Sequence, residues 1–421
     1  MIHYMTTNGI GNSWVANELH QLTRHRIPFK LHAMRSPGEH FHASQWALNM
    51  DKSTNVIYPV NVLALLVSLI IAPLRFGSCF WGALFNAMFS KRESMRVRLA
   101  GLYHFAVACY WARQLQHQQV SLIHSQWIHS GGTIAMYAAW LLGKPFSFTG
   151  HAADLFRERC GLQDKVDRAA FIVCISEFHK DLFMKMGASA DKLHIVHCGI
   201  DVSLFTPKLQ KKTDEIPHII SAGRLVDKKG FEYLIDACAL LRDQNIEFKC
   251  TIAGSGPLEE SLKQRIADRK IQNIVTVTGK AMKQEEIPAF MNDGDIYCLP
   301  CVWAKDNDVD GLPQMLMEAM ACGVPCISTK LVGIPDLLIQ GKTGLLVEPN
   351  DTKQLAEALN VLMHDKPLQQ QMTANGLIHV KKEFDLDTCL EPLVSQYRNF
   401  LGSKSTEITN KPRSTGAKVE S

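Results

Sequence analysis

A chain of 421 residues is longer than a single hydrophobic core usually supports, so we expect two domains. Its composition, 46% hydrophobic and 20% charged, is that of a folded globular protein and excludes a disordered, collagen-like or disulfide-scaffold chain. The formal net charge of +4 is too small to indicate nucleic-acid binding, and the sequence shows no zinc-finger, homeodomain or RNP-like pattern.

Short apolar runs alternate with amphipathic stretches over most of the chain, which is typical of parallel strands joined by crossover helices. We therefore predict an α/β fold with two doubly wound domains. Open parallel sheets bind ligands at the carboxyl ends of their strands, so we expect the ligand site in a cleft between the domains. The predicted strands are 2–7, 29–34, 121–126, 145–150, 171–176 and 193–198 in the first half, and 218–223, 248–254, 274–279, 295–300, 325–330 and 344–349 in the second.

The domain boundaries follow from where this alternation lapses. Between 199 and 217 the apolar periodicity gives way to Pro207, Pro217 and a lysine cluster, which we interpret as the linker. The first domain is then 1–205 and the second 206–385. The helical stretch 386–401 is expected to return to the first domain, and 402–421 has almost no large apolar residues and is expected to be a disordered tail.

The first residues and the cysteines bear on the compartment. MIHYMTTNGIGN lacks a basic region followed by an apolar core, and the 12 cysteines do not have the paired, short spacing of secreted scaffolds. We therefore expect a cytoplasmic protein. Cys298, Cys301, Cys322 and Cys326 have a spacing similar to that of a zinc site, but the first pair falls in a predicted strand and the second closes a helix. We interpret all four as core residues.

One charge-free region, 53–74, departs from the alternation and contains VNVLALLVSLIIAPL. Its strongly apolar core at 60–72 is shorter than the roughly 20 residues of a membrane-spanning helix, so a span is not expected. KRESMRVRLAG then supplies Lys91, Arg92, Arg96 and Arg98 against the single acid Glu93. Apolar surface beside basic surface can hold a protein on an anionic membrane, so two interpretations remain open: a helix pair that covers the sheet, or a peripheral membrane contact.

In the first domain, PFSFTGHAADLF places His151 directly after a predicted strand, at the mouth of the expected cleft. A single histidine among the 17 of this chain is ordinarily incidental. On its position alone His151 is therefore only a candidate.

In the second domain, SAGRLVDKKGFEYLIDA reads as a strand, a tight basic loop and a helix. Arg224 can direct two donors onto phosphate oxygens and Lys229 adds a compact charge, so the loop fits a phosphate clamp. The alternative is a merely solvated basic loop. Lys228 is interpreted as a bystander.

The next loop, in TIAGSGPLEESL, contains Gly254 and Gly256, which permit close backbone approach. It falls short of a full G-x-G-x-x-G pattern, and a glycine turn alone is weak support for nucleotide binding.

The segment DGLPQMLMEAMACG follows a strand and a polar loop and enters an apolar-periodic helix. Pro313 suits the first helical turn, which brings Gly311 and Leu312 to a helix N-terminus whose N–H groups can meet an oxygen-rich ligand. Asp310 precedes the turn and Glu318 lies inside the helix. Two carboxylates so placed can accept hydrogen bonds from sugar or ribose hydroxyls, although an isolated acid pair is usually solvated helix surface.

Taken together, DGLPQMLMEAMACGVPCIST and GRLVDKKG resemble the Glu-x7-Glu segment and the GRL-x3-KG pattern of family 4 glycosyltransferases. TIAGSGPLEESL and VTVTGKAMKQEEIPAFMNDGDIYCLP also resemble that family's second domain, the latter around the nucleobase. The resemblance extends in order over most of the chain, is specific in the second domain and general in the first. It implies the two-domain GT-B fold. Within the family, the chain resembles the enzymes of exopolysaccharide and colanic-acid biosynthesis.

The resemblance also implies roles in donor binding. Glu318 would hold the donor ribose, while Asp310 and the backbone at Gly311 and Leu312, next to Pro313, would hold the transferred sugar. This chain has Asp where the family has the first Glu, which shortens the reach of that carboxylate. Further implied contacts are Arg224 and Lys229 to the diphosphate, Gly254 and Gly256 near the donor, and Gly11, in a glycine loop with Gly9, to the diphosphate across the cleft.

His151 corresponds to a family histidine in a T-x-H setting that contacts the transferred sugar, with Asp154 orienting it or the acceptor. The resemblance implies retaining transfer from a nucleotide-diphosphate sugar to a saccharide or lipid-linked saccharide acceptor. The apolar and basic region of the first domain favours the inner membrane face as the place of transfer. No metal or other cofactor is implied, since Arg224, Lys229 and helix termini would stabilise the diphosphate. Two alternatives remain: a GT-B-type nucleotide-sugar epimerase, which needs no acceptor, and a non-catalytic nucleotide-sugar-binding subunit.

Overall fold

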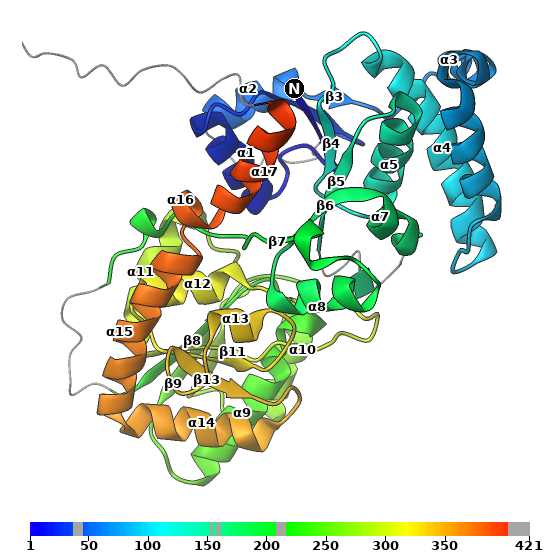
Figure 1. The fold of residues 1–421 in the computed structure, drawn as a ribbon. Helices are drawn as coiled ribbons and strands as arrows, with labels where there is room; N and C mark the ends of the chain where they lie inside the picture. The colour runs from blue at the N-terminus through cyan, green and yellow to red at the C-terminus, as the bar shows by residue number, and fades with distance from the viewer. Residues whose placement is uncertain (37–44, 152–154, 157–160, 208–215, 403–421) are drawn as a thin grey trace, which may run out of the picture.

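The computed structural model describes residues 1–36, 45–151, 155–156, 161–207 and 216–402, and it contains two parallel β-sheets flanked by helices (Figure 1). The first sheet has the order β3-β2-β1-β4-β5-β6-β7 and the second the order β10-β9-β8-β11-β12-β13. The predicted α/β fold is thus confirmed. The strands are β1 (Ile2–Thr6), β2 (Phe29–Ala33), β3 (Asn55–Val56), β4 (Leu122–Ser125), β5 (Phe146–Gly150), β6 (Ala169–Cys174), β7 (Leu193–Ile195), β8 (His218–Ala222), β9 (Lys249–Ala253), β10 (Val275–Val277), β11 (Ile296–Leu299), β12 (Cys326–Thr329) and β13 (Gly344–Val347).

Every strand expected from the sequence is present, because buried parallel strands leave an apolar run that is easy to recognise. The structure adds β3, a two-residue edge strand that pairs with β2 and is too short to leave such a run. The predicted tail at 402–421 lies, apart from Gly402, outside the described residues.

The helices cover both faces of each sheet (Figure 1). Those of the first half are α1 (Ser13–Arg24), α2 (Gln45–Ser53), α3 (Val62–Phe89), α4 (Met95–Leu115), α5 (Ser130–Leu142), α7 (Leu162–Arg168) and α8 (Glu177–Lys185). Those of the second half are α9 (Phe231–Asp243), α10 (Glu259–Asp268), α11 (Ile287–Asp293), α12 (Gln314–Ala321), α13 (Ile334–Leu337), α14 (Thr352–His364), α15 (Lys366–Glu383), α16 (Leu386–Cys389) and α17 (Glu391–Leu401).

The last helix, α17, packs on the first sheet although it follows the second in the chain. Its Leu393, Val394 and Tyr397 are fully buried in the same cluster as Ile2 and Tyr4 of β1. Figure 1 shows α17 beside α1, with α15 and α16 leading back from the second sheet.

The charge-free region forms one long helix, α3, rather than the short run expected at 60–72. The helix continues through Pro73 to Phe89, and Gly77, with φ 53° and ψ −128°, marks a kink. Proline is tolerated inside a helix where a bend accommodates it, so the helix extends well beyond the apolar core at 60–72. Among the described helices α3 is the one that is long and apolar enough to cross a membrane by length and composition, and 11% of its most apolar window is buried.

Candidate active site

Both sheets have a switch point where the strand order reverses, and several of the predicted site residues follow the strands there. In the second sheet β8 lies between β9 and β11, so the loops after β8 and β11 diverge at its carboxyl edge. Arg224 and Lys229 follow β8, while Asp310 and Glu318 follow β11. In the first sheet β1 lies between β2 and β4. Gly11 follows β1, and its N–H bonds to the Asn8 carbonyl at 3.0 Å.

The two glycines after β9 serve the packing of neighbouring loops. Gly254 has φ 147°, and a Cβ there would lie 1.9 Å from the Gly223 carbonyl oxygen. A Cβ on Gly256, with φ 158°, would lie 2.5 Å from the Leu225 carbonyl oxygen. Only glycine therefore lets this loop lie against the one that carries Arg224.

Lys229 forms an ion pair with Asp310. Burial disfavours the Lys229 ammonium, but the Asp310 carboxylate outweighs it and raises the lysine's pKa above its ordinary value. Burial likewise opposes the Asp310 charge, yet Lys229, Lys228 and Arg224 lower its pKa. Sequence reasoning assigned the lysine to phosphate and the aspartate to sugar, and it did not foresee that they contact each other. Arg224 itself is exposed.

Lys228, which the sequence left outside the phosphate clamp, has a structural contact of its own. Its ammonium lies 3.1 Å from a carboxylate oxygen of Asp308, and its carbonyl accepts a hydrogen bond from the Val302 N–H at 3.0 Å. Lys228 therefore fastens the loop that leads to Asp310 onto the basic loop.

Glu318 is a buried carboxyl group, 7% exposed, on the inner side of α12. Its Oε2 has no hydrogen-bond partner in the described part of the chain. Burial raises the pKa of Glu318 to about 7, against a smaller opposing effect of Lys229. A buried oxygen without a partner is costly, so the site is suited to a ligand that donates hydrogen bonds there. Of the neighbouring predicted residues, Leu312 is 8% exposed within the core cluster and Pro313 is the N-cap residue of α12.

His151 lies between two indole rings. Its ring centroid is 4.2 Å from that of Trp14 and 4.7 Å from that of Trp127. Burial and the neighbouring His179 and His124 lower its pKa to about 3, so the ring is neutral near pH 7. The backbone of Gln126 provides a hydrogen bond, and Nε2 has no partner among the described residues. With Nδ1 as the donor, Nε2 is an acceptor.

Sequence reasoning missed the two tryptophans and the buried network beneath them. Trp14 follows the NGIGN loop and Trp127 follows β4, so their positions after strand ends were the available signal. Below them the Tyr4 hydroxyl donates to Glu18 Oε1 at 2.6 Å, and Gln126 Nε2 donates to Glu18 Oε2 at 3.1 Å. Burial raises the pKa of Glu18 to about 7, with both hydrogen bonds acting in the opposite direction. This network holds Gln126, whose backbone orients His151.

Contacts between the two domains lie close to both groups of predicted site residues. The Gly333 N–H donates to the Gly311 carbonyl at 2.9 Å, and a Cβ on Gly333 would lie 2.7 Å from Cβ of Ser176, which follows β6. The Ser176 hydroxyl is 2.6 Å from Nδ1 of His179, which is electrostatically coupled to His151. The structure thus connects His151 with the Gly311 loop through one short chain of residues. Asp154 lies outside the described residues.

A second cross-domain contact is aromatic. The rings of Phe156 and Trp303 are 5.0 Å apart and nearly perpendicular. Trp303 lies in the loop that leads to Asp310, so this contact holds that loop against the first domain.

The four closely spaced cysteines lie in the second core cluster, as expected from their position in strands and at a helix end. Burial raises the pKa of Cys301 to about 12 and holds that of Cys298 well above its ordinary value, which keeps these thiols protonated. Among the described residues no group of three His, Cys, Asp or Glu side chains is placed to hold a metal ion.

The fold and the arrangement of this site define the class of the protein. Solved structures that resemble it include a glycosyltransferase from Rickettsia africae, with TM-score 0.69, 15% identity and coverage of 96% of this chain and 99% of that one. Anabaena Alr3699/HepE in complex with UDP and glucose resembles it with TM-score 0.64 and 16% identity, over 94% and 98% of the two chains. The fold is therefore GT-B.

Sequence comparisons then identify the family. The model "Glycosyltransferase Family 4" matches residues 89–204, and "Glycosyl transferases group 1" matches 205–378. The two matches adjoin and together extend over most of the chain, which belongs to glycosyltransferase family 4.

Curated relatives include WcaL of Escherichia coli, named for colanic acid biosynthesis, which is 36% identical over 46% of this chain and 47% of its own length. The amylovoran biosynthesis glycosyltransferase AmsK of Erwinia amylovora is 35% identical over 50% and 53%. The chain thus matches about half the length of these relatives.

Proposed function

We propose that this protein is a retaining glycosyltransferase that moves a sugar from a nucleotide-diphosphate donor to a saccharide or lipid-linked saccharide acceptor in exopolysaccharide biosynthesis. The observation that carries the proposal is the buried Glu318 carboxyl, with an unpartnered oxygen, beside the Lys229–Asp310 ion pair at the switch point of the second sheet. One acceptor group for ribose hydroxyls and one cation for phosphate lie together there. The names of WcaL and AmsK support the biosynthetic setting.

Each charged residue has a separate task in this reaction. The Glu318 carboxylate accepts hydrogen bonds from the donor ribose. When the diphosphate binds, the Lys229 ammonium donates hydrogen bonds to the phosphate oxygens. Arg224 contacts the same oxygens from the exposed side. Asp310 is then available to a sugar hydroxyl. Neutral His151 accepts a hydrogen bond from another hydroxyl of the transferred sugar.

Transfer then proceeds on one face of the sugar. The bond between the anomeric carbon and the diphosphate oxygen breaks, and the acceptor hydroxyl forms its new bond from the same side. The departing diphosphate takes the proton of that hydroxyl. Arg224 and Lys229 stabilise the negative charge that develops on the diphosphate, a role that pre-positioned cations perform well.

The test compares Lys229→Ala with Lys249→Ala in the full-length protein. Lys249 is exposed at the amino end of β9, at the edge of the sheet opposite the site. A panel of UDP-, GDP- and ADP-linked sugars is first screened for thermal stabilisation, which identifies the donor. Transfer to a polysaccharide or lipid-linked saccharide fraction is then followed by mass spectrometry. Lys229→Ala should reduce transfer by about a hundredfold, the effect of losing one transition-state charge contact, while Lys249→Ala retains most activity. Full transfer by Lys229→Ala would overturn the assignment.

The same assay separates the alternatives. An epimerase converts the donor to a new nucleotide sugar or free sugar without acceptor, and a non-catalytic subunit binds the donor without any turnover. Either result with the wild-type protein contradicts the proposed transfer.

We also predict that transfer does not require a divalent metal ion. Lys229 and Arg224 lie where a metal would otherwise neutralise the diphosphate, and their charge supplies the same stabilisation. Activity should therefore persist in excess EDTA and change less than twofold on addition of about 5 mM Mg²⁺ or Mn²⁺. Abolition by EDTA and recovery with Mn²⁺ would show that the two cations are insufficient.

The proposed site of action is the cytoplasmic face of the membrane, since a lipid-linked acceptor resides there. The support within this chain is the charge-free stretch 53–74 followed by Lys91, Arg96 and Arg98.

A further inference from the structure

The outward side of α3 is a continuous apolar stripe. Leu63, Leu66, Ile70, Leu74, Trp81 and Phe85 recur at helical spacing, and each is at least half exposed, with Leu74 90% exposed. Of the 22 exposed large hydrophobic side chains in the described residues, 12 belong to α3 and α4. They are concentrated rather than scattered, and concentrated exposed apolar surface indicates a binding face. We call it the outer α3–α4 face.

The opposite side of α3 is occupied by the protein itself. Ala83 and Ala87 are fully buried, and a Cβ added to Gly82 would lie 3.2 Å from the Trp140 ring of α5. α3 therefore packs closely on α4 and α5, and Figure 1 shows the α3–α4 pair on the outer side of α5. Since only one side of α3 is available, it is suited to lying in an interface rather than to crossing one.

Charge determines which partner this face fits. Between Asp51 and Asp154 the sequence contains eight Lys and Arg residues and one acid, Glu93. The Glu93 carboxylate accepts a hydrogen bond from the Gly161 N–H at 3.2 Å. Lys91 and Arg96 are exposed where α3 turns into α4. A second copy would bring the same positive charge to the contact and repel it, whereas an anionic surface complements it.

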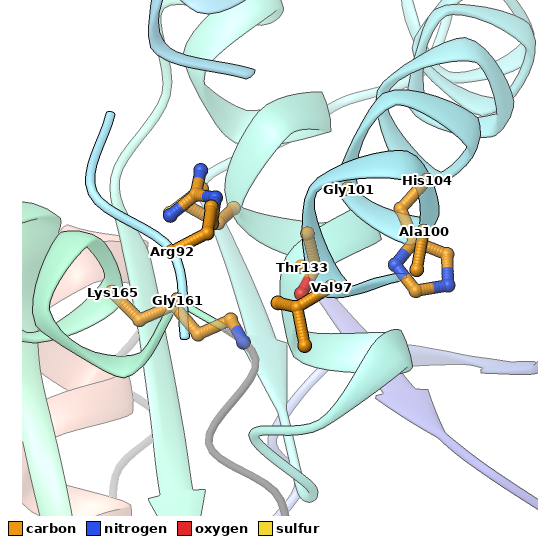
Figure 2. Close-up of a pocket in the computed structure, with 9 residues that line it drawn as sticks. Arg92, Val97, Ala100, Gly101, His104, Thr133, Gly161 and Lys165 are labelled. Carbon is orange, nitrogen blue, oxygen red and sulfur yellow. The ribbon is translucent and has the colours of Figure 1, made fainter. Parts of the chain in front are cut away.

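Arg92, which the sequence placed with this basic group, belongs to the interior instead. Its guanidinium lies 2.5 Å from an Asp164 carboxylate oxygen and 3.0 Å from the Tyr137 hydroxyl, and its side chain is 4% exposed. Figure 2 shows Arg92 lining a small pocket together with His104 and Lys165. Arg92 therefore fastens the start of α4 to α5 and α7, and it does not add to the basic surface beside α3.

We infer that the outer α3–α4 face docks on an anionic lipid bilayer, with the apolar stripe inserted at the level of the headgroups and Lys91 and Arg96 contacting lipid phosphates. α5, against which the pair packs, begins at Ser130, directly after Trp127 beside His151. Docking thus holds against the membrane the domain that carries Trp127 and His151 near the amino end of α5. This use of the face rests on the proposed function, but membrane binding itself is measured without turnover.

The experiment is flotation of the full-length protein with vesicles of phosphatidylcholine alone or with about 30% phosphatidylglycerol, an anionic-surface content comparable to natural leaflets. The wild-type protein should float with the anionic vesicles, and carbonate should release it. Ile70→Gln/Leu74→Gln and Lys91→Gln/Arg96→Gln should each weaken partitioning by about tenfold or more. Val361→Gln/Ile378→Gln, which alters exposed apolar side chains of the second domain, is the matched control and should float normally.

Several outcomes overturn the inference. These are failure of the wild-type protein to float, normal flotation of both outer-face variants, and extraction only by detergent, which indicates a span. Self-association that Ile70→Gln/Leu74→Gln abolishes, without vesicle binding, would identify a second copy as the partner. Stabilisation by the donor is measured on the same variants and should be unchanged, so loss of docking is distinguishable from failure of the proposed transfer.

Discussion

At the residue scale, the site is organised by groups whose charge is opposed by burial. Lys229 and Asp310 keep their charges because they face each other, while Glu318 has no such partner and its pKa rises to about 7. The sequence singled out all three residues. It could not show the ion pair, because the two residues are far apart in the chain and meet only where the loops after β8 and β11 adjoin.

The raised pKa of Glu318 predicts how stability depends on pH. The folded protein holds this proton up to about pH 7, whereas an unfolded carboxyl releases it near 4.5. Stability should therefore fall as pH rises through that window, by roughly 3 kcal/mol at most for this group. Glu318→Gln should flatten the fall in the thermal midpoint between pH 5 and 8 while weakening donor binding by about tenfold to a hundredfold.

Glu18→Gln is the control for this prediction. Glu18 also has a pKa of about 7, so its replacement should flatten the same window. It lies in the first-domain network beneath His151 and away from the ribose contact, so donor binding should fall less than in Glu318→Gln. Equal loss of donor binding in both variants would contradict the assignment of Glu318 to the ribose.

At the scale of elements, loops after neighbouring strands depend on one another. We predict that Gly254→Ala destabilises the protein by about 2 kcal/mol or more and weakens donor stabilisation, because a Cβ would collide with the Gly223 carbonyl and displace Arg224. Gly341 also has positive φ, at 70°, but has nothing within 4 Å of a Cβ. Gly341→Ala should therefore show the backbone strain alone. Thermal unfolding with and without donor measures the stability and the donor stabilisation of each variant. Equal losses in Gly254→Ala and Gly341→Ala would show that the loop contact is unimportant.

The helices illustrate where sequence patterns reach their limit. Apolar runs identified the strands, but the strongly apolar core at 60–72 did not reveal a helix that continues through Pro73 and past Gly77 to Phe89. Whether a proline ends or bends a helix depends on what the following residues pack against, here α4 and α5. The same holds for Arg92, which a linear count of charges assigned to the surface.

At the scale of the whole molecule, the two ends of the chain share one core. Leu393 of α17 is fully buried against residues of β1 and α1. We predict that Leu393→Ala lowers the free energy of unfolding by about 2–5 kcal/mol and that hydrogen exchange accelerates in β1. Asn399→Ala, at an exposed position of the same helix, should change it by less than about 0.5 kcal/mol. Unchanged exchange in β1 would indicate that α17 is dispensable for the first domain.

The sequence by itself determined the α/β class, the positions along the chain of all strands except β3, and the family. Buried strands and short ligand-binding motifs are local patterns, so the sequence is enough to recognise them. Only the tertiary structure decided which of those motifs touch. In the folded chain Lys229 pairs with Asp310, and His151 lies between Trp14 and Trp127. Arg92 is buried in an ion pair, and the outer side of α3 stays exposed. The physical reason is that burial and charge partners come from residues distant in the chain, and they set both the pKa of each group and the surface that it presents.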